Sequence, residues 1–101
     1  MQNRYSRYRN VLHSKTYPLG YVDLDLFDQN ITDLVSRAKG TPIRLASKSV
    51  RCMELILRVL KNPGFRGVMA YRGYEALKLA DAGITDILMG YPLSDPNEIS
   101  A

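Results

Sequence analysis

The chain has 101 residues, with 14 Lys plus Arg, 10 Asp plus Glu and a formal net charge of +4. Its 46% hydrophobic and 24% charged residues are typical of one small globular domain, and exclude a disordered, collagenous or disulfide-built chain. No apolar run approaches the roughly 20 residues of a membrane helix, so we expect no membrane partner. The single cysteine, Cys52, favours a reducing compartment, and we expect a cytoplasmic protein.

Residues 1–18 are predicted to form a basic N-terminal arm. Arg4, Arg7, Arg9 and Lys15 lie in the first fifteen residues without any acid, so the remainder of the chain is neutral overall. Tyrosines alternate with these arginines, and such a composition can suit single-stranded nucleic acid. A folded nucleic-acid binder would carry its charge on the globular part. We therefore expect no nucleic-acid partner, and interpret the arm as a subunit or domain contact or a solvated segment.

Residues 19–101 have the pattern of a parallel α/β fold. The expected elements are a strand at 21–24, a helix capped by Asp25 and ended by Gly40, a strand at 42–46, a helix from Ser49 to about Lys61, a strand at 67–71, a helix between Gly73 and Gly83, a strand at 86–89 and a helix start at 94–95. The last three strands are short apolar runs, as expected for parallel strands covered on both faces. A closed eight-stranded barrel needs roughly 250 residues. The chain is therefore either a small open α/β sheet or the N-terminal portion of a (β/α)8 barrel.

Lys48 is the candidate catalytic residue. It follows the strand at 42–46, and α/β folds place their active sites at the carboxyl ends of parallel strands. The helix start expected after it disfavours a cation and so favours the neutral amine that forms Schiff bases. The alternative is a solvated lysine in a strand-to-helix loop. The only histidine, His13, lies in the arm, so we expect neither a histidine triad nor a metal site within this chain.

The order of several short motifs resembles a known family. The matching pieces are Tyr21–Asp25, Asn30–Ile31, Pro42–Ser49, Glu75–Ala76, Ala82–Gly83 and Asp86–Pro92. Together they resemble fold-type III pyridoxal-phosphate enzymes, the alanine racemase N-terminal domain superfamily, over about residues 18–92. The branch they resemble most is that of D-threonine aldolase, D-serine dehydratase and amino-acid deaminase-like proteins. D-threonine aldolases often have a histidine where this chain has Ala46, and at this position the chain departs from the aldolase pattern.

The resemblance implies that Lys48 holds pyridoxal 5′-phosphate as an internal aldimine and acts at Cα of a small, D-configured amino acid. The reaction would be that of an aldolase, dehydratase, deaminase or racemase. The resemblance further implies that the strand at 21–24 joins a second, β-rich domain and that the next three strands open a barrel. The phosphate site and the ligands of a divalent metal would lie outside this chain, so we expect little turnover from these 101 residues alone.

Other residues have two interpretations each. Arg44 matches a family position and is a candidate cofactor-binding residue, or it forms a structural ion pair. Tyr71 is a second candidate cofactor-binding residue, or it packs against a neighbour. Arg51 could hold a carboxylate or phosphate, or it is a solvated helix residue. Cys52 is expected to be a partly buried apolar residue.

Three functions remain open at this point. The first is the pyridoxal-phosphate enzyme, which would take a small amino acid as its substrate. The second is a non-enzymatic pyridoxal-phosphate-binding or homeostasis protein of the same barrel type. The third is a cofactor-free α/β interaction domain. Because a barrel of three strands leaves strand edges unpaired, we also expect the chain to associate as a homo-oligomer.

Overall fold

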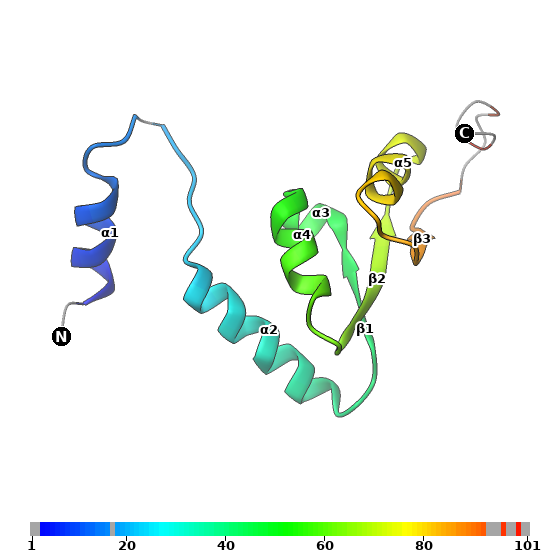
Figure 1. The fold of residues 1–101 in the computed structure, drawn as a ribbon, viewed down its shortest axis with the longest axis horizontal. Helices are drawn as coiled ribbons and strands as arrows, with labels where there is room; N and C mark the ends of the chain where they lie inside the picture. Colours follow the sequence, from blue (N-terminus) through cyan, green and yellow to red (C-terminus); the bar gives the residue numbers. More distant parts are fainter. Residues whose placement is uncertain (1–2, 17, 93–95, 97–98, 100–101) are drawn as a thin grey trace.

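The computed structural model describes residues 3–16, 18–92, 96 and 99. Its elements, in chain order, are α1 (Arg4–Leu12), α2 (Leu24–Ala38), β1 (Ile43–Ala46), α3 (Ser47–Val50), α4 (Met53–Leu60), β2 (Phe65–Ala70), α5 (Gly73–Asp81) and β3 (Ile87–Met89) (Figure 1). The helix start expected at residues 94–95 lies outside the described residues. None of the described helices combines the length and the apolar character needed to cross a bilayer.

The three strands form one parallel sheet in the order β1-β2-β3. Val68 in the central strand is paired with Leu45 on one side and Ile87 on the other, and the next residue, Met69, is paired with Ala46 and Leu88. Strand alternation therefore places these two rows on opposite faces of the sheet. The mixed α/β class with parallel strands is confirmed, whereas a closed barrel is not shown by the described residues.

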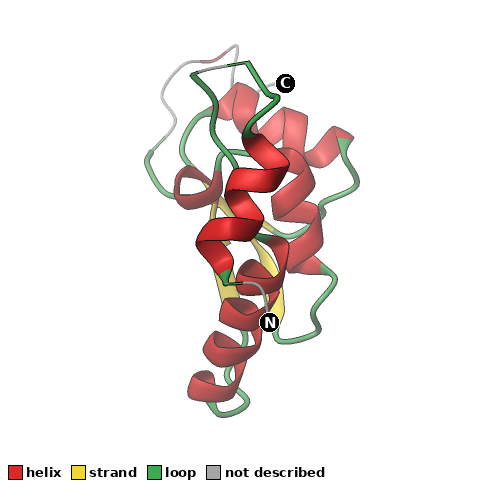
Figure 2. Cartoon of the chain, turned by 90° about the vertical axis from the view of Figure 1, so that its left-hand side faces the viewer, coloured by secondary structure: helices red, strands yellow, loops and turns green. Residues whose placement is uncertain are grey.

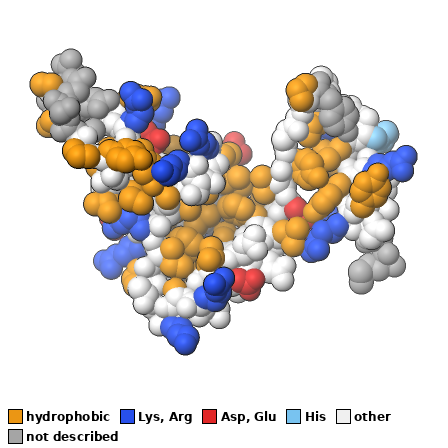
Figure 3. Space-filling view, turned by 180° about the vertical axis from the view of Figure 1, so that it is seen from behind, with side chains coloured by type: hydrophobic (Ala, Val, Ile, Leu, Met, Phe, Trp, Pro, Cys, Tyr) orange, Lys and Arg blue, Asp and Glu red, His pale blue; other side chains and the backbone are white. Residues whose placement is uncertain are grey.

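One face of the sheet is covered by α4 and α5. Val68 is fully buried there, packed with Ile56 of α4 and with Leu79 and Ile84 of the α5 segment. A second cluster continues this core toward α2, where Ile31 packs against α4 and β2. On the opposite row, by contrast, Leu88 is 52% exposed. In Figure 3, which views the molecule from behind, hydrophobic side chains gather across the middle of the body and again over α1.

A bulge in β2 depends on a glycine. Ile43 of β1 pairs with Phe65 of β2, and the next pair is Leu45 with Val68. Between these two pairs the chain advances by two residues on β1 and by three on β2, and Gly67 is the extra residue. Its φ of +76° is unfavourable for residues with a side chain. A Cβ at this position would also lie 2.3 Å from the carbonyl oxygen of Asp86. Only glycine allows the strand that leads to the site to bend here.

The N-terminal region differs from the sequence prediction. Residues 4–12 of the predicted arm form α1, whose N-cap is the side chain of Asn3. The strand expected at 21–24 is wrong, and Asp23 rather than Asp25 caps α2, because its carboxylate accepts hydrogen bonds from the backbone amides of Asp25 and Leu26. Residues 21–24 have an alternating pattern, but no described strand lies beside them to form the hydrogen bonds of a sheet.

The helix α1 stands away from the sheet in Figure 1, and in Figure 2 it lies in front of the strands. The radius of gyration is 16.9 Å, whereas a compact chain of this length has about 13 Å. The carboxylate of Asp23 joins α1 to α2: it accepts hydrogen bonds from Arg7 Nη2, at 2.6 Å, and from the hydroxyl of Tyr8. Tyr8 also contacts Tyr21, with ring centroids 5.4 Å apart.

Candidate active site

The carboxyl ends of the three strands bring together a cluster of basic and aromatic side chains. Lys48 follows β1, Tyr71 and Arg72 follow β2, and Tyr91 follows β3 after one intervening glycine. A cleft of about 310 Å³ opens between them, and its lining residues are Lys48, Arg51, Tyr71, Arg72, Tyr74, Glu75 and Tyr91. The expected position of Lys48 at the carboxyl edge of a parallel strand is confirmed, and its chemical role stays a prediction.

The amine of Lys48 lies against two tyrosine rings. Its Nζ is 4.5 Å from the ring centroid of Tyr71 and 6.0 Å from that of Tyr91, and the two rings meet edge to face at 5.4 Å. The negative faces of these rings attract a cationic group placed over them. The side chain is exposed rather than partly buried, so the amine is accessible to a ligand.

Gly90 makes room for this arrangement. A Cβ at Gly90 would lie 2.8 Å from Cε1 of Tyr71, closer than a ring can tolerate without moving. The amide of Gly90 donates a hydrogen bond of 2.7 Å to the carbonyl of Ala70, which fixes the end of β3 beside the end of β2. Gly90 and Tyr91 were not predicted as site residues. They follow the strand expected at 86–89, so the same carboxyl-edge rule that selected Lys48 could have found them.

The chain after Lys48 does not form the single helix expected from Ser49 to Lys61. It forms the one-turn helix α3, ends at Arg51 with a φ of 53°, and starts again at α4 after Cys52. The amide of Arg51 donates to the carbonyl of Ser47 at 2.8 Å, which closes the first turn. Lys48 therefore lies inside a short helical turn that packs at the end of β1, and not in a loop before a long helix.

A part-buried hydrogen bond joins α3 to α5. The hydroxyl of Ser47 donates to Oε1 of Glu75 at 2.6 Å, and the same oxygen accepts the amide of Tyr71 at 3.1 Å. Ser47 is only 4% exposed. One carboxylate oxygen thus joins the residue before Lys48 to the start of the Tyr71 segment. This contact holds the two sides of the cleft at a fixed spacing.

The structure does not bring Arg44 to the cleft. Its Nη1 donates to Oδ1 of Asp86 at 2.7 Å and lies 3.4 Å from the carbonyl oxygens of Val68 and Asp86. Asp86 precedes β3 and therefore lies at the end of the sheet opposite to the cleft. The structural ion pair, the alternative weighed for Arg44, is the arrangement that the structure shows. Arg44 is therefore not positioned to contact a cofactor in the Lys48 cleft.

Cys52 is exposed, so the expectation of a partly buried thiol is wrong. The break between α3 and α4 turns this residue outward instead of placing it on the packed face of a continuous helix. Across the described residues, no three His, Cys, Asp or Glu side chains gather in a way that could hold a metal ion.

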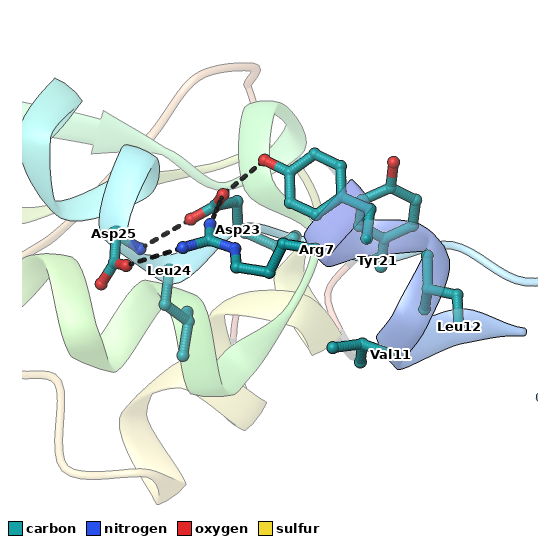
Figure 4. A pocket seen from close by; sticks show the side chains of 9 residues that line it. Arg7, Val11, Leu12, Tyr21, Asp23, Leu24 and Asp25 are labelled. Carbon is teal, nitrogen blue, oxygen red and sulfur yellow. Dashed lines mark hydrogen bonds and ion pairs between the residues drawn. The ribbon is translucent and has the colours of Figure 1, made fainter. Parts of the chain in front are cut away.

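A second hollow, between α1 and the start of α2, has about 320 Å³ and is mostly apolar (Figure 4). Its charged side chains and the hydroxyl of Tyr8 form hydrogen bonds and ion pairs with one another. The hydrogen bond from Tyr8 is the main reason that the pKa of the Asp23 carboxyl lies below its ordinary value, and the same bond raises the pKa of Tyr8. Because these groups are already paired and distant from the strand ends, the hollow is a weaker candidate than the Lys48 cleft.

Comparison with protein-family models, with curated proteins and with solved structures found no match for this chain.

Proposed function

We propose that the protein is a pyridoxal-phosphate-dependent enzyme that acts at Cα of a small, D-configured amino acid, with Lys48 as the residue that holds the cofactor. The observation that carries the proposal is the position of the Lys48 amine in an open cleft at the carboxyl edge of three parallel strands, where α/β enzymes carry out their chemistry. The resemblance of residues 18–92 to fold-type III enzymes adds the choice of cofactor.

The chemical types of the side chains that line the cleft match the parts of pyridoxal phosphate. The cleft offers a primary amine for a carbonyl carbon, tyrosine rings for contact with a planar heterocycle, and three cations against one acid for an anionic group. When bound, pyridoxal phosphate supplies an electron sink for the charge that develops at Cα.

The residues of this chain have separate tasks in the proposed reaction. Nζ of Lys48 takes up and returns the proton at Cα as the general base on one face of the substrate. Tyr71 and Tyr91 hold the ammonium form through their ring faces after the proton arrives. The Ser47–Glu75 hydrogen bond positions Lys48 relative to Tyr71.

The wider proposal concerns the protein to which this sheet belongs. In the proposed protein, β1, β2 and β3 are the first three strands of a (β/α)8 barrel. Any divalent metal is held by ligands outside this chain. Copies of the protein associate as a homo-oligomer in the cytoplasm. The reaction is a lyase, deaminase or racemase reaction.

Reductive trapping tests the cofactor assignment. The chain is incubated with pyridoxal phosphate, reduced with borohydride, digested, and mapped by mass spectrometry for the modified lysine. We expect the label on Lys48 to exceed that on Lys61, an exposed lysine after α4, by at least about tenfold. Lys48→Arg should remove the selective label, whereas Lys61→Arg, the matched control, should leave it unchanged. Label spread evenly over the lysines would refute the assignment and favour the cofactor-free interaction domain.

Proton exchange separates the enzyme from a non-enzymatic cofactor-binding protein. Deuterium incorporation at Cα of D-alanine and D-serine is followed by NMR in D2O, with pyridoxal phosphate alone as the background. Because these 101 residues alone are expected to turn over little substrate, slow exchange above background that is lost in Lys48→Arg is the result expected of the enzyme. Selective labelling of Lys48 without such exchange would favour the binding protein.

A further inference from the structure

The resemblance to fold-type III enzymes implies a phosphate site outside this chain. We propose instead that Arg51 and Arg72 form an oxyanion subsite beside Lys48, which binds the phosphate or carboxylate group of the molecule that Lys48 engages. The proposal rests on the proposed function for the role of Lys48. The anion site itself can be tested with inorganic phosphate alone.

The charge of the cleft is the first support. Its lining residues include three cations, Lys48, Arg51 and Arg72, and a single acid, Glu75, so the lining carries a net charge of +2. Oε1 of this acid already accepts hydrogen bonds from Ser47 and from the amide of Tyr71. Among the described lining residues the cleft therefore holds an excess of positive charge, which favours an anionic ligand.

The second support is that neither arginine has a carboxylate partner in the part of the chain that the structure describes. Three other arginines of the same molecule are paired with aspartates at 2.6–2.7 Å, in Arg7–Asp23, Arg44–Asp86 and Arg58–Asp28.

The third support is the way in which the two guanidinium groups are held. Nε of Arg51 donates to the carbonyl of Lys48 at 3.1 Å, and within the described residues both terminal nitrogens are available as donors. The guanidinium of Arg72 lies over the ring of Tyr74, 5.1 Å from its centroid, and such stacking leaves its edge donors free. A planar guanidinium group with available N–H donors matches the spacing of phosphate and carboxylate oxygens.

The backbone conformation of Arg51 is a fourth support for the anion subsite. Its φ of 53° lies in the left-handed region, which residues other than Gly, Asn and Asp rarely adopt, and such residues cluster at ligand sites. The strained turn places the arginine side chain next to the lysine three residues earlier. A glycine would make the same turn without strain and would supply no donor.

The test compares each of two anionic aldehydes with a neutral counterpart. Pyridoxal phosphate is paired with pyridoxal, and glyoxylate with glycolaldehyde. In each case Nζ attacks the carbonyl carbon, the carbonyl oxygen leaves as water, and cyanoborohydride delivers hydride to the C=N carbon while nitrogen takes a proton from solvent. The secondary amine on Lys48 is quantified against that on Lys61 of the same molecule, which corrects for the intrinsic reactivity of each aldehyde.

We expect at least one anionic aldehyde to label Lys48 about tenfold faster than its neutral partner, as a charge-assisted hydrogen bond allows. Arg51→Ala and Arg72→Ala should each reduce that preference severalfold, whereas Arg37→Ala, which removes an exposed arginine from the last turn of α2, should not change it. Loss of the pyridoxal-phosphate preference identifies a phosphate subsite, and loss of the glyoxylate preference a carboxylate subsite. A preference that is absent, or that both cleft variants retain, overturns the proposal even if Lys48 is labelled selectively.

A second measurement keeps the anion site testable where a variant does not fold or Lys48 is not labelled. Inorganic phosphate is titrated into the wild-type chain while the side-chain NH signals of its arginines are followed by NMR. Saturable shifts of the Arg51 and Arg72 signals, without matching shifts at Arg37, support the subsite even if the cofactor assignment fails. Equal, non-saturating shifts at all three arginines, or none, overturn it.

Discussion

The hydrogen bond between Ser47 and Glu75 allows the most detailed prediction about the site. The hydroxyl of Ser47 is buried and donates to a carboxylate oxygen at 2.6 Å, and the same oxygen accepts the amide of Tyr71. A hydrogen bond to a charged group contributes about 1.5–3 kcal/mol. Ser47→Ala removes one such bond and leaves the carboxylate bonded to the amide, so it should cost about 1–2 kcal/mol. Glu75→Ala leaves both donors without their acceptor and should cost about 3 kcal/mol.

A double-mutant cycle isolates the contact. Urea unfolding is measured for the wild type, the two single variants and the double variant, with the m-value checked for constancy. Once Ser47 is alanine, Glu75→Ala no longer leaves a buried hydroxyl unpaired, so we expect a coupling energy of about 1–2 kcal/mol. Free energies that add within about 0.3 kcal/mol would refute the claim that this bond joins the two sides of the cleft. Lys78→Ala, which removes an exposed side chain from the same helix, serves as the control and should couple to neither.

Three further predictions concern the body of the fold. Val68→Ala, at a fully buried position in the central strand, should cost about 2–3 kcal/mol and lower the melting temperature by about 10–20 °C in thermal circular dichroism; an unchanged melting temperature would contradict the packing of the core. Lys39→Gly should raise the free energy of unfolding by about 1 kcal/mol, because residue 39 ends α2 at a φ of 50°; a loss of stability in urea would contradict that backbone conformation. The hydrogen bond from Arg58 is the main cause of a pKa of Asp28 below its ordinary value of 3.8. Its contribution to stability is therefore complete above that value and is lost as the pH falls through the lower folded-state pKa. Urea midpoints measured across this acid range should fall less steeply in Asp28→Asn than in the wild type, and an equal slope would contradict the pairing.

Much of the α/β body was predictable because its signals are local. The strands that became β1, β2 and β3 are short apolar runs bounded by glycine and proline, and each was expected within one or two residues of its observed bounds. The same pattern placed Lys48 and Tyr71 at one edge, because the carboxyl ends of parallel strands meet there. The structure brings both residues to one cleft.

The parts that were not predicted depend on contacts that are distant in sequence or on backbone without a marker residue. Asp23 caps α2 and binds α1 through Arg7 and Tyr8, and a short alternating segment around it does not reveal these partners. The break at Arg51 uses a left-handed residue that is not glycine, so nothing in the sequence marks it. Arg44 matched a family position, but its side chain reaches Asp86, a residue 42 positions away.

The most direct test of the central claim is an absorbance titration of the chain with pyridoxal phosphate, carried out in parallel on wild type, Lys48→Ala and Lys61→Ala. A protein-bound carbonyl–amine linkage of this cofactor absorbs in the visible range. We predict a saturable visible band in wild type and Lys61→Ala that is absent in Lys48→Ala. An equal band in all three proteins, or none in the wild type, would contradict the assignment of Lys48 as the residue that holds the cofactor.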